Sequence, residues 1–259
     1  MKKTIISIMA LASFSFFANA ADYMVVKTAD GSEDVYEMKH VTEMYYEEVD
    51  DVATVQGVSV NGKVGEYAYV DLYLPSGTKW ATYNVGASNP TGAGDLFAWG
   101  ETKSKNDYSL ASYKWFDASA EKYTKYGYLN GEMSGAGAGG KQYTGVNCVD
   151  DGKFNLEVED DAATVNWGGD WRMPTATELK ELFDGCVWVL TNNFNGSGVA
   201  GLVGTSKKNG NIIFLPDANG YWSSTLDVTR PSDALYIGNN KIYVPVSRFQ
   251  GKYVRAVVK

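Results

Sequence analysis

The sequence predicts an α+β fold with one or two helices, short antiparallel strands and long loops. Only one segment, residues 175–185, carries every signal of a well-defined helix, and a shorter helix is expected over residues 156–167. Short runs rich in β-branched and aromatic residues recur between turn residues at uneven spacing, which is typical of strands. No segment alternates strand, helix and strand as a parallel α/β protein does. We therefore expect antiparallel sheets with a small helical component.

Residues 1–20 have the organisation of an export signal. Lys2 and Lys3 supply a basic start, residues 4–17 are mainly apolar, and Ala18-Asn19-Ala20 fits a small-residue cleavage site. The apolar stretch is too short to span a bilayer as a helix, and no later run is apolar enough to do so. We expect cleavage near Ala20, a secreted, periplasmic or cell-surface location, and no membrane insertion.

A small β unit is predicted over residues 21–50, followed over residues 51–64 by a linker or a loosely held strand. The unit has, in order, a strand at 23–28, a turn at Asp30-Gly31, a return strand at 35–38 and a third strand at 41–48. Three short strands are marginal on their own, so we expect this unit to lean on the main domain or on a partner.

The main domain is predicted over residues 65–259. It opens with two strands around the tight turn Pro75-Ser76-Gly77. Residues 107–145 are rich in Tyr, Ser, Gly and Lys and lack an apolar period, which indicates long loops. Gly238-Asn239-Asn240 is a hairpin signal. The later strands are expected at 186–190, 211–216, 221–225, 233–238, 241–246 and 253–258.

The best-specified helix follows Pro174, which prevents an earlier start. Thr175 and Glu178 have the spacing of a capping box. Leu179, Leu182 and Phe183 fall on one helical face, and Gly185 can end the helix. Ahead of it, "LEVEDDAATVNW" begins with acidic residues, which suit the positive end of a short helix.

Several segments together resemble the Fibrobacter succinogenes major paralogous domain family. They are "VDLYLPSGTKWATYNVGA", "GDLFAWGET", "LEVEDDAATVNWGGDWRMPTATELKEL", "IIFLP", "GYWSST" and "SRFQGKYVRAVV". The resemblance covers residues 65–259 and implies a C-type-lectin-like domain of the branch that includes the formylglycine-generating enzymes. Such folds join both chain ends in one sheet and carry long loops on the far side. The N-terminal unit resembles segments at the front of secreted Bacteroidetes proteins.

Composition and charge exclude some partners. The formal net charge is −8, and removal of the two signal lysines makes the chain more acidic still. An acidic chain without a basic stripe repels phosphate backbones, so we expect neither nucleic acid nor an anionic membrane surface as a partner.

The sequence offers no convincing catalytic or metal-binding set, so we assign no catalytic residue, metal or cofactor. His40 is the only histidine and no serine lies in a nucleophile elbow, which disfavours Ser/His hydrolysis and a zinc centre. Calcium could in principle use oxygen ligands, but the acids do not follow an EF-hand spacing and are expected to cap a helix or line a loop. These acids are Asp150, Asp151, Glu157, Glu159, Asp160 and Asp161.

Cys148 and Cys186 are the only cysteines. An oxidising compartment permits a bridge between them, but spacing cannot establish its geometry, so a disulfide and two buried thiols both stay open. Members of the resembled family often carry a cysteine where this chain has Tyr83. A redox enzyme of the formylglycine-generating type would need reactive thiols, and the acids beside Cys148 oppose a thiolate.

The aromatic residues are assigned mainly to the core, with Gly168-Gly169 taken as close backbone packing between rings. The tryptophans expected to be structural are Trp80, Trp167, Trp171 and Trp222. Trp115 lies in a long loop and is the one expected to be exposed. Arg172 is expected to pair with Glu178 or with the acids before it.

These observations favour an exported, non-enzymatic binding or surface-interaction module. Its binding face would be the loops over residues 107–145 and 227–249, with Trp115, Tyr236 and Arg248 as candidate contacts to a glycan or cell-surface protein. The alternatives are a formylglycine-generating-type redox enzyme and a structural subunit of a surface assembly, in which the N-terminal unit would add a strand to a neighbour. The sequence does not predict the oligomeric state.

Overall fold

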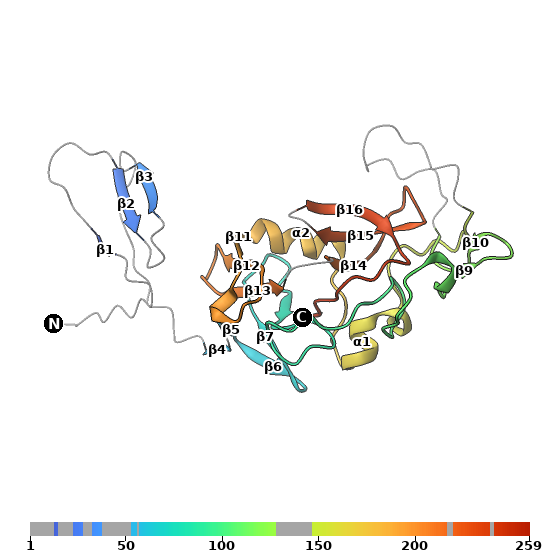
Figure 1. The fold of residues 1–259 in the computed structure, drawn as a ribbon, viewed down its shortest axis with the longest axis horizontal. Coiled ribbons are helices and arrows are strands. Elements are labelled where there is room, and N and C mark those ends of the chain that lie inside the picture. Colours follow the sequence, from blue (N-terminus) through green and yellow to red (C-terminus); the bar gives the residue numbers. More distant parts are fainter. Residues whose placement is uncertain are drawn as a thin grey trace. The chain divides into compact units, whose positions relative to one another are not determined.

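The computed structural model describes the backbone of residues 13–14, 23–27, 33–37, 53–55, 57–127, 147–216, 220–238 and 241–259. Side chains are described over 57–127, 147–216, 220–237 and 245–259. The chain divides into two compact units, Met1–Val49 and Asp50–Lys259. Figure 1 shows both units, which are considered separately below.

The first unit is a small antiparallel sheet. It contains β1 (Ser13–Phe14), β2 (Tyr23–Lys27) and β3 (Glu33–Glu37), in the order β1-β2-β3. Val25 lies opposite Val35 in the β2–β3 pair. The predicted hairpin is thus present. The turn at Asp30-Gly31 and the third predicted strand at 41–48 lie outside the described residues.

Residues 51–64, for which a linker or a loosely held strand was predicted, form strands of the second unit. This segment contains β4 (Ala53–Val55), β5 (Val58–Val60) and β6 (Gly62–Val64). Val58 is fully buried and clusters with Phe194 and Phe214. The apolar contacts of Val58 hold this segment against the rest of the domain. The polar composition of the segment gave no indication of these contacts.

One four-stranded sheet pairs the last strand of the chain with three strands from the first part of the domain. β6 is followed by β7 (Tyr67–Val70), β8 (Lys79–Ala81) and β17 (Val257–Val258), in the order β17-β8-β7-β6. Val257 pairs with Trp80, whose side chain is fully buried.

The longer helix lies where the sequence predicts it, whereas the shorter one, predicted over residues 156–167, is α-helical only over its second half. α1 spans Ala162–Trp167 after the 3-10 turn η3 (Val158–Asp160), and Asp161 caps it by accepting from the backbone of Thr164 at 2.9 Å. α2 spans Ala176–Gly185, and Thr175 and Glu178 form the predicted capping box. Two further 3-10 turns are η2 (Leu110–Ser112) and η4 (Phe194–Gly196). No helix in the described ranges is long and apolar enough to cross a bilayer.

Two three-stranded antiparallel sheets follow α2 in the chain. The first contains β11 (Cys186–Thr191), β12 (Gly201–Ser206) and β13 (Ile212–Pro216). The second contains β14 (Tyr221–Leu226), β15 (Asp233–Gly238) and β16 (Lys241–Ser247). All were predicted except β12, whose two glycines disguise a strand. A Cβ on Gly204 would lie 2.6 Å from ring carbons of Trp188 on β11, so glycine admits that indole.

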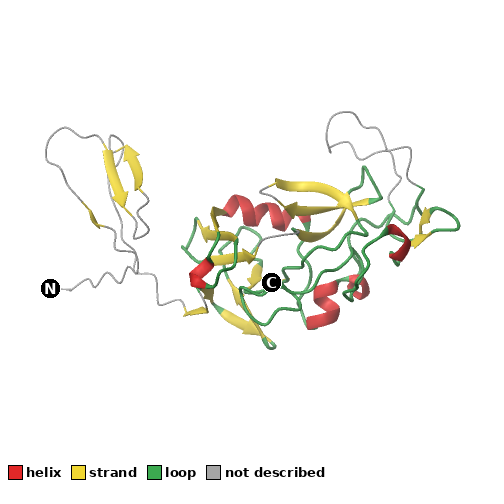
Figure 2. Cartoon of the chain, viewed as in Figure 1, coloured by secondary structure: helices red, strands yellow, loops and turns green. Residues whose placement is uncertain are grey.

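The predicted long loop is irregular over its described part. Over residues 107–127 it contains the 3-10 turn η2 and the short strands β9 (Phe116–Asp117) and β10 (Lys122–Tyr123), which pair with each other. Figure 2 shows how much of this end of the domain is loop rather than sheet or helix.

The core confirms the structural role of three predicted tryptophans. Trp80, Trp171 and Trp222 are almost completely buried. Trp167 is half-buried and stacks on Tyr67 with ring centroids 3.9 Å apart.

The glycine pair between Trp167 and Trp171 serves a different purpose from the predicted close packing. Gly168 and Gly169 have φ values of 70° and 61°, and a Cβ on either would meet no atom within 4 Å. Glycine is favoured there because the backbone is left-handed.

The described elements together form an α+β fold of few helices and mainly antiparallel strands.

Candidate functional site

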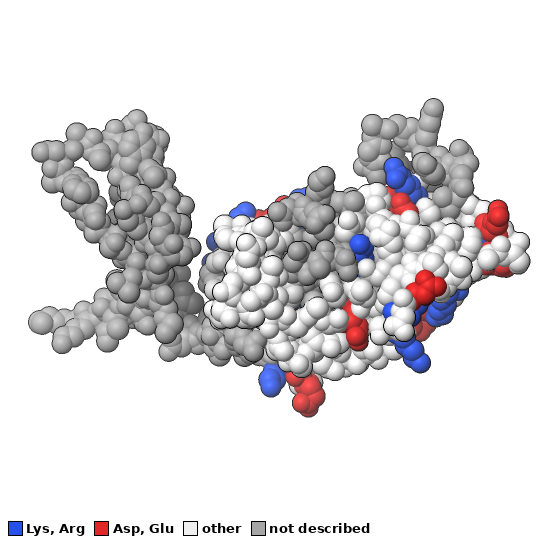
Figure 3. Space-filling model, viewed as in Figure 1, with Lys and Arg blue, Asp and Glu red and all other residues white. Residues whose placement is uncertain are grey.

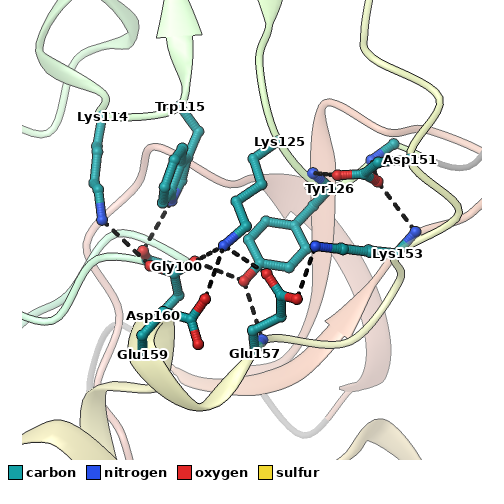
Figure 4. A network of polar contacts seen from close by, with 11 residues as sticks. Gly100, Lys114, Trp115, Lys125, Tyr126, Asp151, Lys153, Glu157, Glu159 and Asp160 are labelled. Carbon is teal, nitrogen blue, oxygen red and sulfur yellow. Dashed lines mark hydrogen bonds and ion pairs between the residues drawn. The ribbon is translucent and has the colours of Figure 1, made fainter.

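A network of charged side chains surrounds Asp160, at the end of η3 (Figure 4). The Asp160 carboxylate is buried and accepts hydrogen bonds from three donors. Lys125 Nζ lies 2.6 Å away, the Tyr126 hydroxyl 2.7 Å and Lys114 Nζ 3.2 Å. The network therefore ties the loop around residues 114–126 to the start of α1.

Lys125 joins Asp160 to two further acids. Its Nζ lies 2.6 Å from Glu157 Oε2 and 3.5 Å from Glu159 Oε1. The other oxygen of Glu157 accepts from Lys153 Nζ at 2.7 Å. Three acids and three lysines thus alternate in one cluster, and shared partners hold its side chains in defined positions.

Trp115 forms one side of this cluster and is half-buried. Its Nε1 donates to the Gly100 carbonyl at 2.9 Å, which fixes the indole. Lys114 Nζ and Lys125 Nζ lie 4.1 and 5.0 Å from a ring centroid of Trp115, within the range of cation–π attraction. The indole is therefore a rigid apolar surface bordered by hydrogen-bonding groups.

The backbone after Lys125 is shaped to place Tyr126 in the network. Tyr126 has a φ of 63°, a left-handed conformation that is uncommon for a bulky residue. Asp151 holds this turn by accepting from the backbone amides of Tyr126 at 3.0 Å and Gly127 at 2.9 Å. A Cβ on Gly127 would lie 1.5 Å from the Val149 carbonyl oxygen, so only glycine fits.

The charges in the network reinforce one another. Burial alone would raise the pKa of Asp160, but hydrogen bonds from Lys125, Tyr126 and Lys114 hold that pKa below its ordinary value. Burial alone would lower the pKa of Lys125, but its hydrogen bonds to Asp160 and Glu157 raise it. The pair is therefore ionised at neutral pH.

Glu157, Glu159 and Asp160 are the one acidic group in the described ranges that could hold a metal ion, with ligand atoms within 4.8 Å of one another. The Lys125 ammonium already lies among their oxygens. A cation would have to displace it, so the donor set suits an internal ion pair better than calcium. Asp161 caps α1, as the capping interpretation expects.

No protein-family model, curated protein or solved structure matches the chain. The resemblance drawn from the sequence motifs, and the lectin-like fold it implies, stay predictions. Function is therefore argued from the geometry of the site.

Arg248 lies beneath the same loop and is fully buried. Its Nη1 donates to the carbonyls of Lys125 at 3.1 Å and Tyr126 at 2.8 Å. The guanidinium carbon lies 4.2 Å from the Tyr123 ring centroid, and Nε and Nη2 have no acceptor among the described residues. A surface ligand cannot reach Arg248 in this conformation. It instead supports the loop that carries Lys125, through hydrogen bonds to two of its carbonyls.

Tyr236 lies apart from the Asp160 network. It is half-buried, its ring meets Trp222 edge-on at 6.1 Å, and Lys252 Nζ lies 4.8 Å from its centroid. The structure therefore places Trp115 and Arg248 around one loop, with Trp115 at the network and Arg248 beneath it.

Both cysteines are free thiols, so the structure contains no bridge between Cys148 and Cys186. They are buried in different clusters, Cys148 with Tyr113 and Tyr123, and Cys186 with Leu182. Burial raises the pKa of Cys148, although Arg248 opposes the shift, and burial raises the pKa of Cys186 to about 11. Neither thiol has the surroundings of a nucleophile.

Sequence reasoning found Trp115 and the acids but missed the lysines that connect them. Lys114 and Lys125 are 46 and 35 residues from Asp160, a separation at which no periodic signal operates. The alternation of lysine and aromatic residues in "YKWF" and "KYTKYG" was the only available indication.

Proposed function

We propose that the protein is an exported, non-enzymatic binding module whose ligand is a glycan held against Trp115. The observation that carries this proposal is the half-buried indole fixed to Gly100 and bordered by lysines and carboxylates. Flat apolar rings beside convergent polar groups are the usual composition of a small-ligand site. Export is inferred from residues 1–20.

The chemistry of the border favours a neutral, hydroxyl-rich ligand. The Lys114 side chain is 52% exposed and that of Glu159 68% exposed, so a donor and an acceptor are both available beside the ring. A sugar presents C–H groups to an indole and hydroxyls to charged groups. A neutral sugar is repelled neither by the lysines nor by the carboxylates of the border. The ion pairs keep the side chains of the border ordered before the ligand binds, and this order reduces the entropic cost of binding.

A glycan array probed with purified protein tests this proposal. We expect W115A to weaken binding by about 2 kcal/mol or more, about thirtyfold in Kd, and W115F to retain part of the affinity. Y73A is a matched control, because Tyr73 is an aromatic residue 65% exposed outside the network.

A second pair of variants separates recognition from folding. Because Trp115 also packs on the core, W115A could unfold the loop. K114Q and E159Q alter groups at the border that are at least half exposed, and we expect each to reduce binding. E159Q should leave the thermal midpoint unchanged, whereas K114Q should lower it slightly because it removes the contact with buried Asp160. Binding to proteins but to no glycan, or glycan binding unchanged in all these variants, would contradict the proposal.

The two alternative functions, a redox enzyme and a structural subunit, require different features of the protein. A redox enzyme needs an accessible thiolate, and the buried thiols with raised pKa values argue against one. Copper uptake, or rapid reaction of either thiol in the folded protein, would favour it. A structural subunit needs a surface through which copies or partners associate, which sedimentation of the protein would detect.

A further inference from the structure

The edge strand β11 combines a backbone edge that is unpaired within the described ranges with apolar side chains that are open to solvent. β11 pairs with β12 in an unbroken register of six residue pairs, from Cys186↔Ser206 to Thr191↔Gly201. Its other edge has no strand partner among the described residues. Unpaired edge amides and carbonyls are a template for pairing with another strand.

β11 also lacks the features that normally protect an edge. It contains no charge, no proline and no bulge. The edge strands β6, β9, β10 and β16 each contain a charged residue, and the side chains of the uncharged edge strands β5, β13, β14 and β17 are mainly buried. Its apolar side chains are open to solvent: Val187 is 55% exposed, Val189 60% and Leu190 65%. An edge of this kind is maintained in a soluble protein only if something covers it.

Charge favours a second copy of the chain as the occupant. No charged residue lies between Asp184 and Lys207, a stretch that includes all of β11 and β12. Figure 3 shows the end of the domain that carries β11 to β13 as a mainly white surface. The chain has a net charge of −8, so two copies repel each other over most of their surfaces, and this neutral face lets them meet without like-charge contacts.

The strand is also complementary to itself. In an antiparallel pair, residues on one face of the first strand lie opposite residues on the same face of the second. A two-fold axis through Trp188 places Val187 opposite Val189 of the second copy and joins the two sheets into one. Each exposed valine then covers an exposed valine, as an isologous interface requires.

From these observations we infer that the protein forms a two-fold symmetric dimer by antiparallel pairing of β11 with β11 of a second copy. This inference is independent of the glycan site, which lies on another part of the domain. A pair of short strands is a small interface, so we expect reversible, concentration-dependent association.

Sedimentation of the purified full chain over a wide concentration range tests the dimer. We expect V189K to weaken dimerisation by about tenfold or more, because it buries ammonium groups beside the axis. V189T keeps a β-branched strand former and should weaken it less. V165K is the matched control, because Val165 is a 51% exposed valine on α1. A wild-type monomer at every concentration, or a dimer equally stable in V189K, would overturn the inference.

Amide hydrogen exchange distinguishes a second copy from coverage within one chain. We expect the outward amides of residues 186–191 to exchange quickly in dilute protein and slowly in concentrated protein. V189K should abolish that concentration dependence while leaving the β12 amides protected, which shows that the domain is folded. Protection of β11 that is the same at all concentrations would mean that another segment of the same chain covers the edge, and would overturn the inference.

Discussion

The Lys125 ammonium lies 2.6 Å from a carboxylate oxygen of the buried Asp160 side chain. This pair connects the loop around residues 114–126 to the start of α1. Two further donors, Tyr126 and Lys114, share the same carboxylate. The pair therefore has consequences for stability as well as for the order of the Trp115 site.

Replacing Asp160 with Asn should destabilise the protein. D160N keeps the shape of the side chain but removes the charge that Lys125 and Lys114 face, and we expect a loss of about 2–3 kcal/mol in the free energy of unfolding. Urea unfolding measures this loss. The control is D184N, because Asp184 is 57% exposed and pairs only at the surface with Lys180. That variant should change stability by less than about 0.5 kcal/mol, and equal effects would contradict the network's role.

Glu178 should make the stability of the protein depend on acid pH. Burial opposes its ionisation, but hydrogen bonds from Arg172, the Thr175 amide and Thr78 lower its pKa to about 2. Because the folded pKa lies below the unfolded one, the stabilisation is complete above about pH 5 and is lost as the pH falls toward 2. It amounts to about 3 kcal/mol at most.

Unfolding free energies measured between about pH 5 and pH 2 test this linkage. E178Q should flatten the pH dependence in that range, whereas E66Q, at an exposed position, should leave it unchanged. An unaltered slope in E178Q would show that other carboxyl groups carry the acid sensitivity.

The two cysteines should react only after unfolding. Burial raises the pKa of Cys186 to about 11 and that of Cys148 above its ordinary value, so little thiolate forms near pH 8. We expect a thiol-specific reagent to modify the native protein slowly and to titrate both thiols in denaturant. A disulfide detected by mass spectrometry in the purified native protein would contradict the free thiols of the structure.

Gly204 should tolerate no side chain while Trp188 is present. A Cβ would lie 2.6 Å from the Trp188 ring and 3.0 Å from Ile213 Cγ2. G204A should therefore cost about 1–3 kcal/mol in unfolding free energy. The same substitution should cost less in a W188A background, and a double-mutant cycle measures that coupling. Additive effects would show that the indole is not the obstacle.

Local signals made several elements predictable. The box formed by Thr175 and Glu178 and the proline before it are read within a few residues, and α2 begins where they indicate. Runs such as 221–225 contain strand-forming residues between turns, and β14 is found there. β12 was not predicted because glycine, present at Gly201 and Gly204, has low strand propensity. Only the tertiary structure shows that a side chain at these positions would collide with the Leu215 carbonyl and the Trp188 ring.

The candidate site was only partly predictable. Trp115 was recognised because a large aromatic residue in a polar loop is unusual. Arg248 was a candidate ligand contact, and it is fully buried under the loop whose carbonyls it binds. A single sequence does not distinguish an arginine facing solvent from one enclosed by rings, because the rings around Arg248 come from distant positions such as Tyr113 and Tyr123.

By itself the sequence determined the class of fold, the capped helix and most strands, because these depend on backbone preferences and contacts between near neighbours. Only the tertiary structure decided that Lys125 meets Asp160, that Arg248 is enclosed and that one edge of β11 has no strand partner among the described residues. Those outcomes depend on which strands and loops lie next to one another, and burial then determines the energy of each charge and each unpaired strand.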